Sequence, residues 1–181
     1  RYITPVWRVL EENLSNEFKH AIKEVGLPVM VKLVNGGSSI GMYKITTIRE
    51  LDSVVRKIHN GKHKKSSYFI EKFIEGRNFT VGILDFPSRS IVLPITEIIT
   101  RDGTTYDEKL KIQSQEGKKV AEYIVPARLT VRQQEVIKRS VLDIYHRSYC
   151  SGFARVDFII DKKGKIYFLE LNSTPGLQRD S

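Results

Sequence analysis

Two carboxylates and a carboxamide near the end of the chain have the types and spacing to bind a metal ion. The glycine of Lys163-Gly164 can adopt a positive φ angle, which predicts a β-hairpin with these residues as a two-residue tip. In that register Asp157 faces Glu170, and Arg155 faces Asn172 on the same side. Opposed carboxylates repel each other unless a cation compensates them. Because oxygen ligands of this kind suit Mg²⁺ or Mn²⁺, the hairpin predicts a metal site at Asp157, Glu170 and Asn172.

The same register places apolar pairs on the other face, as expected for a face that packs on a core. These pairs are Val156 with Leu171, Phe158 with Leu169, and Ile160 with Tyr167. Nearer the tip, Ile159 faces Phe168 on the polar side. The alternative to a metal site is a solvent-exposed face on which Arg155 bridges both acids. A register slip of one residue would separate Asp157 from Glu170 and remove the argument for a metal.

A loop rich in glycine and serine, Asn35–Gly41, follows the apolar segment Pro28–Val34 and has the composition to hold phosphates. Its backbone N–H groups and hydroxyls can bind phosphate oxygens. It matches neither the P-loop nor the dinucleotide-binding pattern, and a β-hairpin turn has the same composition. Lys32 interrupts the apolar segment just before the loop. Because an unpaired buried charge is unfavourable, this lysine needs an anionic partner such as phosphate, unless it lies on an edge strand and reaches water.

Apolar periodicity and capping residues predict the elements that position these groups. The first part of the chain is expected to form a β-rich segment Tyr2–Val9, a helix from Ser15 to Gly26, the strand Pro28–Val34, a helix from a capping box at Thr47–Glu50 to Gly61, and the strand Tyr68–Ile74. The second part is expected to form the strands Phe79–Leu84 and Ile91–Ile99, a polar loop from Arg101 to Lys119, a helix from a capping box at Thr130–Gln133 to Tyr149, and the hairpin of Phe153–Ile160 and Lys165–Leu171.

Size and charge restrict the class of protein. The 181 residues suffice for one domain or two small lobes, and 40% hydrophobic with 28% charged residues are ordinary globular values. The net charge of +9 indicates a nucleic acid or a small polyanion as partner. The densest basic segment, Arg56–Lys65, contains no aromatic residue to stack a base. We therefore expect it to be a solvated helix end and loop, and both classes of partner stay open.

The expected compartment is the cytoplasm. No apolar run is long enough to span a membrane, and no signal peptide opens the chain. Cys150 is the only cysteine, so an internal disulfide is impossible. Because the chain opens at Arg1 rather than at a methionine, we expect it to be part of a longer protein.

Three sets of motifs together resemble the ATP-grasp fold and, within it, the D-alanine–D-alanine ligase family. They are Leu27–Lys32 with Gly37–Gly41, Phe69–Gly76 with Phe79–Val81, and Ala154–Asp157 with Leu169–Gly176. The resemblance covers essentially the whole chain. It implies an α+β fold in which two α+β lobes clamp ATP, and it makes ATP rather than a nucleic acid the expected partner. Residues 1–76 would form the small lobe, with a mobile lid loop at 35–41 and a hinge strand at 68–74, and residues 77–181 the catalytic lobe.

The resemblance implies a role for each matching residue. The residues that would contact the phosphates are Lys32, Ser38, Ser39 and Lys111, with Ser38 and Ser39 in the lid loop. Those that would hold adenine are Glu71, Lys72, Phe73 and Ile74, and Asn78 would stand at the ribose. Asp157, Glu170 and Asn172 would bind two Mg²⁺ or Mn²⁺ ions. The catalytic residues would be Arg155, the backbone near Gly176, Lys111 and Ser39, and the substrate-binding residues Arg155 and Ser181.

The implied reaction is phosphorylation of an amino-acid carboxylate by ATP, followed by attack of a second amino acid's amine on the acyl phosphate. The product would be D-alanyl-D-alanine for peptidoglycan synthesis and cell shape. Asn78 stands where the family commonly has a glutamate, and Ile112 where it often has a tyrosine. These departures leave open another ATP-grasp dipeptide ligase, or an inactive nucleotide-binding module. The family's amino-terminal domain and the helices after Ser181 are outside this chain, so we expect the chain alone to form no dipeptide. Dimers are common in the family, which leaves a homodimer open for the full-length protein.

Overall fold

The computed structural model describes residues 2–10, 15–37, 40–100 and 121–175 of the chain. They belong to two compact units. The small unit comprises Pro5–Ile74, and the large unit comprises residues 2–4, 75–100 and 121–175 within the described ranges.

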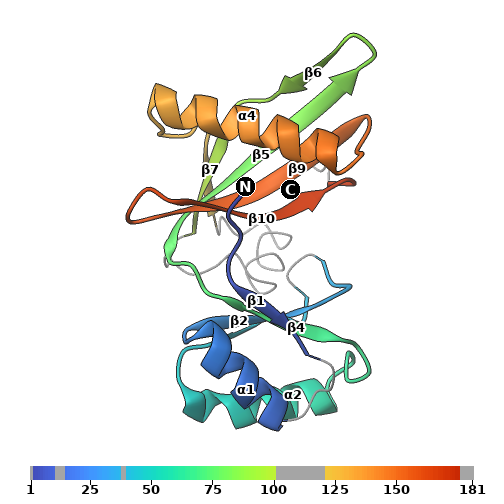
Figure 1. The fold of residues 1–181 in the computed structure, drawn as a ribbon, viewed down its shortest axis with the longest axis vertical. Helices are drawn as coiled ribbons and strands as arrows, with labels where there is room; N and C mark the ends of the chain where they lie inside the picture. The colour runs from blue at the N-terminus through green and yellow to red at the C-terminus, as the bar shows by residue number, and fades with distance from the viewer. Residues whose placement is uncertain (1, 11–14, 38–39, 101–120, 176–181) are drawn as a thin grey trace. The chain divides into compact units, whose positions relative to one another are not determined.

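The small unit is a four-stranded antiparallel sheet with two helices (Figure 1). Its strands are β1 (Trp7–Val9), β2 (Val29–Leu33), β3 (Tyr43–Ile45) and β4 (Tyr68–Lys72), in the order β1-β4-β2-β3. The helices are α1 (Ser15–Val25) and α2 (Leu51–Asn60). Their apolar faces pack on the sheet around Phe18, Leu51 and Ile70, each fully buried. The predicted helices and strands of this part are confirmed, but the first strand is shorter than predicted and β4 ends at Lys72 rather than Ile74. Strand β3 is not predicted from the sequence.

The ends of the two helices differ in how well the sequence predicts them. Gly26 ends α1 at a φ of 79°, as expected for a glycine after the last helical turn. The capping box predicted at Thr47–Glu50 is wrong, because Thr47 caps no backbone N–H. Residues Ile48–Glu50 instead form a short 3₁₀ turn before α2, and the Glu50 carboxylate accepts the backbone N–H of Thr46 at 2.8 Å.

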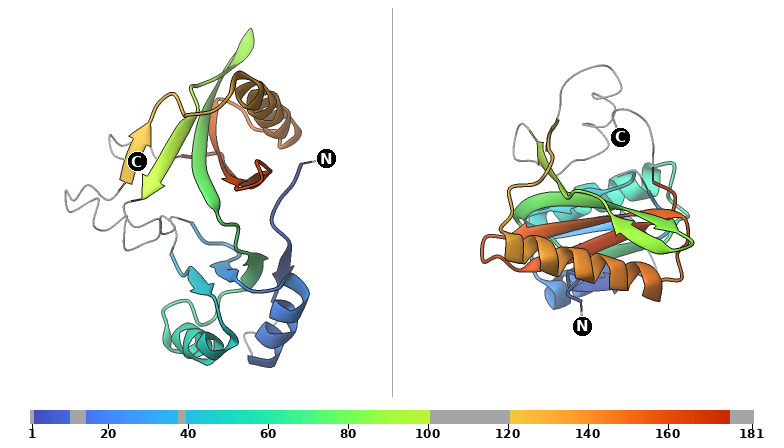
Figure 2. Two further views of the ribbon diagram at one scale, coloured as in Figure 1. Left: turned by 90° about the vertical axis from the view of Figure 1, so that its left-hand side faces the viewer. Right: turned by 90° about the horizontal axis from the view of Figure 1, so that it is seen from above.

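The large unit is a six-stranded antiparallel sheet with one long helix, α4 (Val131–Arg147), across one face (Figure 2). Its strands are β5 (Gly76–Phe86), β6 (Arg89–Val92), β7 (Thr96–Thr100), β8 (Ala121–Ile124), β9 (Phe153–Asp161) and β10 (Ile166–Asn172). The strand order is β10-β9-β5-β7-β8, and β6 pairs with β5 beside it. The buried residues Phe79, Val156 and Ile137 belong to the core under α4.

Two predictions for this unit are corrected. The segment Ile91–Ile99 is not one strand, because β6 ends at Val92 and β7 begins at Thr96 on the other side of Pro94. Strand β8 was not predicted at all. The capping box at Thr130 is confirmed, since the Thr130 hydroxyl accepts the N–H of Gln133 at 3.2 Å and the Gln133 side chain accepts the N–H of Thr130 at 3.0 Å.

The tip of the β9–β10 hairpin is one residue longer than predicted. The N–H of Asp161 donates to the carbonyl of Lys165 at 3.0 Å, which leaves residues 162–164 as the loop. Gly164 has a φ of 79°, and the Asp161 carboxylate accepts the N–H groups of Lys163 and Lys165. A three-residue loop with glycine in the left-handed region is a common hairpin turn, and the aspartate stabilises it.

This longer loop shifts the pairing near the tip, and a β-bulge then restores it. Phe158 pairs with Phe168, Ile159 with Tyr167 and Ile160 with Ile166, so the predicted pairs Phe158–Leu169, Ile159–Phe168 and Ile160–Tyr167 are wrong. The register changes between Phe168 and Glu170, where Leu169 is the additional residue. Beyond the bulge, Asp157 pairs with Glu170, Val156 with Leu171 and Arg155 with Asn172, as predicted. The bulge therefore decides that both carboxylates share a face.

Candidate active site

The polar face of the large sheet carries the candidate site in two neighbouring cross-strand rows. Thr80 of β5 pairs with Asp157 of β9, which pairs with Glu170 of β10. In the next row, Gly82 pairs with Arg155 and Arg155 pairs with Asn172. Residues of adjacent strands that face each other share one side of a sheet, so all the side chains of these rows lie on the side opposite the core residues Phe79 and Val156.

Asp157 is the centre of the hydrogen-bond network. Arg155 donates to both of its carboxylate oxygens, Nε to Oδ1 and Nη2 to Oδ2, each at 3.0 Å. The Thr80 hydroxyl donates to Oδ1 at 2.5 Å, and the Asn172 amide donates to Oδ2 at 3.2 Å. The same amide donates to Glu170 Oε1 at 3.0 Å. The bidentate contact with Arg155 gives Asp157 a fixed orientation.

The guanidinium of Arg155 stays positively charged in this setting. Its burial lowers its pKa, but the hydrogen bonds and charge of Asp157, together with the charge of Glu170, outweigh burial and hold the pKa above its usual value. Arg155 pairs with Asp157, so the predicted alternative in which it bridges both acids is not the arrangement found. One cation thus faces two carboxylates here.

The donor set fits a hard divalent cation. Nowhere in the described residues do three His, Cys, Asp or Glu side chains gather in a way that could hold a metal ion, so a site here needs a donor of another type, such as the Asn172 carboxamide. Two carboxylates and a carboxamide on adjacent strands are the oxygen donors that Mg²⁺ or Mn²⁺ prefers. Asp157, Glu170 and Asn172 would hold the ion, with the Asn172 amide turned to present its oxygen.

In the small unit, Lys32 has a protein partner that sequence reasoning did not identify. Its Nζ lies 2.5 Å from Oε1 of Glu71, whose side chain is 10% exposed. Strand β2 pairs with both β3 and β4, so Lys32 is not on an edge strand. Because Glu71 neutralises it, the argument that burial requires a phosphate fails. A phosphate contact at Lys32 and an adenine contact at Glu71 remain predictions from the family.

Part of the segment predicted to hold adenine makes hydrogen bonds within the small unit. Lys72 Nζ donates to the carbonyls of Gly26 at 3.0 Å and Leu27 at 2.5 Å, which ties β4 to the end of α1. The N–H of Phe73 donates to the carbonyl of Pro28 at 3.0 Å. Within the described residues, the Phe73 carbonyl and the Ile74 N–H make no backbone hydrogen bond. These two groups are what the segment can offer to an adenine edge.

Asn78 lies on the same face of the large sheet as Asp157. It is half-buried on β5, two residues before Thr80, and pairs with Ile159 of β9 and Ile98 of β7.

Six residues named from the resemblance lie outside the described residues: Ser38, Ser39, Lys111, Ile112, Gly176 and Ser181.

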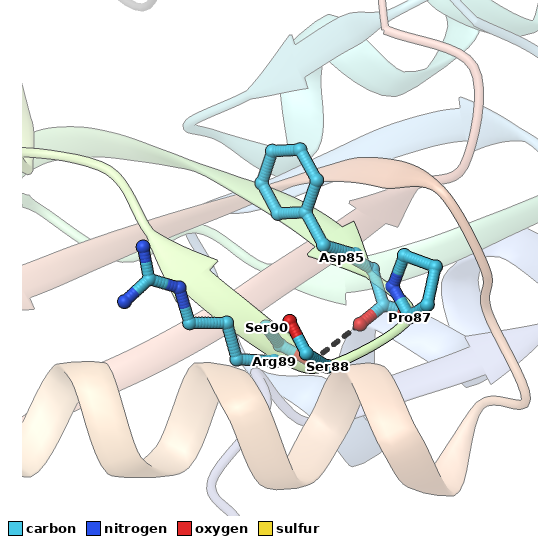
Figure 3. Close-up of a pocket in the computed structure, with 6 residues that line it drawn as sticks. Asp85, Pro87, Ser88, Arg89 and Ser90 are labelled. Atoms are coloured by element: carbon cyan, nitrogen blue, oxygen red, sulfur yellow. Dashed lines mark hydrogen bonds between the residues drawn. The ribbon is translucent and has the colours of Figure 1, made fainter.

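The basic segment Arg56–Lys65 is the end of α2 and the turns that follow, as predicted. Its basic side chains are exposed except that of His63, which is half-buried. A hollow of about 430 Å³ lies between this segment and the glycine-rich loop, lined among others by Gly36, His63 and Lys65. Another, of about 550 Å³, lies at the turn between β5 and β6, where the Ser90 hydroxyl donates to Asp85 at 2.6 Å (Figure 3). No predicted site residue lines the second hollow.

Sequence reasoning missed a second carboxylate cluster, on the face of the large sheet that carries Phe79. Glu97 of β7 is 2% exposed. Arg77 donates to both its oxygens at 2.8 Å, and Arg128 donates to both at 3.1 and 3.2 Å. The hydrogen bonds from Arg77 lower the pKa of Glu97 to about 2, with a contribution from Arg128 and against the effect of burial. No local spacing in the sequence links these three residues.

The fold is that of the ATP-grasp ligases. D-alanyl-alanine synthetase A from Vibrio cholerae superposes with a TM-score of 0.81 at 21% identity, covering 99% of this chain and 53% of that one. The VanG D-Ala:D-Ser ligase from Enterococcus faecalis gives 0.76 at 24% identity, covering 99% and 50%. An L-amino acid ligase from Bacillus licheniformis gives 0.69 at 22% identity, covering 97% and 37%.

The family follows from the sequence comparisons. The family model for the D-ala D-ala ligase C-terminus matches residues 4–181. A D-alanine–D-alanine ligase from Nitrosospira multiformis is 33% identical over 178 residues, covering 98% of this chain and 54% of the relative. One from Flavobacterium psychrophilum is 34% identical over 167 residues, covering 92% and 47%. The chain belongs to the D-ala D-ala ligase C-terminus family, and it spans about half the length of the curated relatives it matches.

In the described part of the chain, no helix combines the length and apolar character that a membrane span requires.

Proposed function

We propose that this chain supplies the ATP- and metal-binding part of a cytoplasmic ligase that forms D-alanyl-D-alanine for peptidoglycan precursors. The observation that carries the proposal is the row of Asp157 and Glu170 with Asn172 and Arg155 beside it, on paired strands of an ATP-grasp fold. The family of the chain and the named activity of its relatives point to the same reaction.

Each region of the chain has a part in this proposal. The small unit, Pro5–Ile74, is the proposed small lobe, in which Phe73 and Ile74 offer backbone groups to adenine and Lys32 contacts phosphate. Residues 77–181 form the catalytic lobe, in which Asn78 binds the ribose. Lys111, with Ser38 and Ser39 of the lid loop, adds phosphate contacts, and Ser181 binds the acceptor carboxylate.

The chemistry is a phosphoryl transfer followed by an acyl transfer. The donor carboxylate attacks the γ-phosphorus of ATP, and the bond to ADP breaks to give an acyl phosphate. The acceptor amine then attacks the acyl carbon, and inorganic phosphate leaves as the amine loses a proton. Two Mg²⁺ or Mn²⁺ ions bound at Asp157, Glu170 and Asn172 would neutralise the phosphate charge.

Arg155 has the charge and position to act in the second step. Its guanidinium is fixed by two hydrogen bonds to Asp157 and remains cationic. With the backbone near Gly176, it stabilises the negative oxygen that develops on the attacked carbonyl. Such preorganised donors contribute roughly 3 kcal/mol of transition-state stabilisation.

The second candidate is a ligase that makes another dipeptide. It is favoured by Ile112 and Asn78, which depart from the residues common in the family, and by neighbours in fold that are named for D-Ala:D-Ser and for L-amino acids. Both candidates need the same metal site, so the site does not separate them.

The experiment is an assay of phosphate release by the full-length protein with ATP, Mg²⁺ and a panel of D- and L-amino acids. Phosphate release and dipeptide formation with D-alanine alone support the leading proposal. Activity confined to other amino acids supports the second candidate. Nucleotide binding without any turnover identifies an inactive module. Analytical ultracentrifugation of the same preparation measures its mass in solution and tests whether the full-length protein is a homodimer.

A further inference from the structure

We propose that Thr80 is a positioning residue for the metal-binding carboxylate of Asp157. The inference rests on the proposed function, because it assigns a role within the same site. Thr80 lies within the motif Phe79–Val81, but the resemblance assigns it no role. Its hydroxyl is nevertheless the donor with the shortest hydrogen bond to Asp157, at 2.5 Å.

The backbone holds Thr80 in a fixed place opposite Asp157. Thr80 lies on β5, which pairs with β9 on one side and with β7 on the other. Thr80 is therefore in the interior of the sheet and not on an edge strand. Its side chain is half-buried and directly faces Asp157 across the strand pair. Its branched β-carbon restricts the hydroxyl to few rotamers, which limits the entropy lost when it holds the hydrogen bond.

Thr80 differs from the other two donors to Asp157 in what else it does. Arg155 contacts both oxygens of Asp157 and is proposed to act on the substrate, and Asn172 is proposed to bind metal. Both have to serve a second group during the reaction. Among the described residues, the Thr80 hydroxyl donates to Asp157 alone. It can therefore keep the carboxylate in one orientation while Arg155 and Asn172 contact substrate and metal.

A hydrogen bond to a metal ligand typically changes metal affinity by about 10- to 100-fold when it is removed. Thr80→Val keeps the shape and the branched β-carbon but deletes the donor. Thr80→Ser keeps the donor. Thr96→Val is the matched control, since Thr96 pairs with Thr80 on the neighbouring strand, shares its face and is also half-buried.

The test is binding of Mn²⁺ to the full-length protein in the presence of ADP, followed by the electron paramagnetic resonance signal of free and bound Mn²⁺. Circular dichroism melting of each variant checks the fold. Asp157→Asn is measured alongside to establish that the signal reports this site.

We expect Thr80→Val to weaken Mn²⁺ binding about 10-fold and to broaden the spectrum of bound Mn²⁺. Thr80→Ser should bind within about 2-fold of the unmodified protein, and Thr96→Val should be unchanged. If Asp157→Asn abolishes binding while Thr80→Val binds normally, or if Thr80→Ser fails to restore binding, the role of Thr80 is refuted and the metal site stands. If Asp157→Asn binds Mn²⁺ normally, the metal site itself is refuted.

Discussion

Glu97 and Asp157 are carboxylates on opposite faces of one sheet, and their surroundings differ in charge balance. Glu97 accepts four hydrogen bonds from two guanidiniums, and its side chain is 3% exposed. Asp157 also accepts four hydrogen bonds, but only two come from a cation, Arg155, and its side chain is 21% exposed. Glu170 beside it adds a second negative charge.

The difference separates a carboxylate that stabilises the fold from one that can bind a ligand. At Glu97 two positive charges surround one negative charge, so a further cation would be repelled. At Asp157 one positive charge faces two negative charges, so the site has a net negative charge that attracts a divalent cation. The count of hydrogen bonds is the same at both sites, so charge and exposure rather than hydrogen-bond satisfaction distinguish them.

The largest expected effect is loss of activity after Asp157→Asn. This substitution removes one negative charge from the site and leaves the side-chain shape. We expect ADP formation to slow by roughly 100-fold or more, because metal ligation depends on that charge. A coupled assay of ADP release measures it. Asp85→Asn is the control, since Asp85 accepts from Ser90 at the β5–β6 turn and lies outside the site (Figure 3); an equal loss in this control would contradict the comparison.

The next effect is loss of stability after Glu97→Gln. The substitution leaves Arg77 and Arg128 facing each other without a carboxylate. Breaking a buried pair by removing one partner costs about 3–5 kcal/mol, and the partial exposure of both arginines reduces the expected value here to about 2 kcal/mol. Urea denaturation measures the change in the free energy of unfolding. Mn²⁺ binding by the folded fraction should stay the same, and a selective loss of Mn²⁺ binding would contradict a purely structural role.

Acid should remove the contribution of Glu97 in a defined pH range. Its pKa is about 2 in the folded protein against an ordinary value of 4.5, so the unfolded chain takes up the proton first as pH falls. The stabilisation is complete above about pH 4.5 and declines as pH falls towards about 2. The difference in free energy of unfolding between the unmodified protein and Glu97→Gln should therefore shrink from pH 5 to pH 2. If this difference in free energy of unfolding grew as the pH fell, the lowered pKa of Glu97 in the folded protein would be contradicted.

The smallest effect is expected for Arg128→Ala. Arg77 still donates to both oxygens of Glu97 at 2.8 Å, so the carboxylate keeps a cationic partner. We expect a smaller loss of stability than for Glu97→Gln, since the Arg128 side chain is 61% exposed. Thermal melting compared with Arg139→Ala, a surface arginine on α4 that is 84% exposed, measures it. A loss as large as that of Glu97→Gln would show that the two arginines are not redundant.

Local patterns predicted most of the fold. The helices α1, α2 and α4 follow apolar periodicity, and both Gly26 and the Thr130–Gln133 box mark helix ends as expected. The box at Thr47 failed because the Thr47 hydroxyl caps no backbone N–H, while the Glu50 carboxylate accepts the N–H of Thr46 at 2.8 Å. Residue type alone does not reveal which of two neighbouring N–H groups a carboxylate accepts.

The candidate metal site was predicted in part through two errors that cancel. The hairpin tip has one more loop residue than predicted, and the bulge at Leu169 shifts the pairing back. The pairing of Asp157 with Glu170 is therefore correct, although the pairs nearer the tip are not. A bulge depends on how the whole sheet twists and packs, which residue spacing within the hairpin does not encode.

Contacts between distant segments could not be predicted. Lys32 and Glu71 are paired through strands β2 and β4, and Glu97 meets Arg77 and Arg128 from β5 and from the segment after β8. Thr80 reaches Asp157 across 77 positions of sequence. Each contact needs the strand order, and sequence analysis assigned no strand order beyond the last hairpin.

The central claim is that Asp157 and Glu170 bind the metal that accompanies ATP. Calorimetric titration of the full-length protein with ATP and Mg²⁺, before and after Asp157→Ala with Glu170→Ala, tests it most directly. We predict that the double variant loses at least about 10-fold in Mg²⁺-dependent ATP affinity while its melting temperature shows that it remains folded. Equal ATP affinity in a folded double variant would contradict the claim.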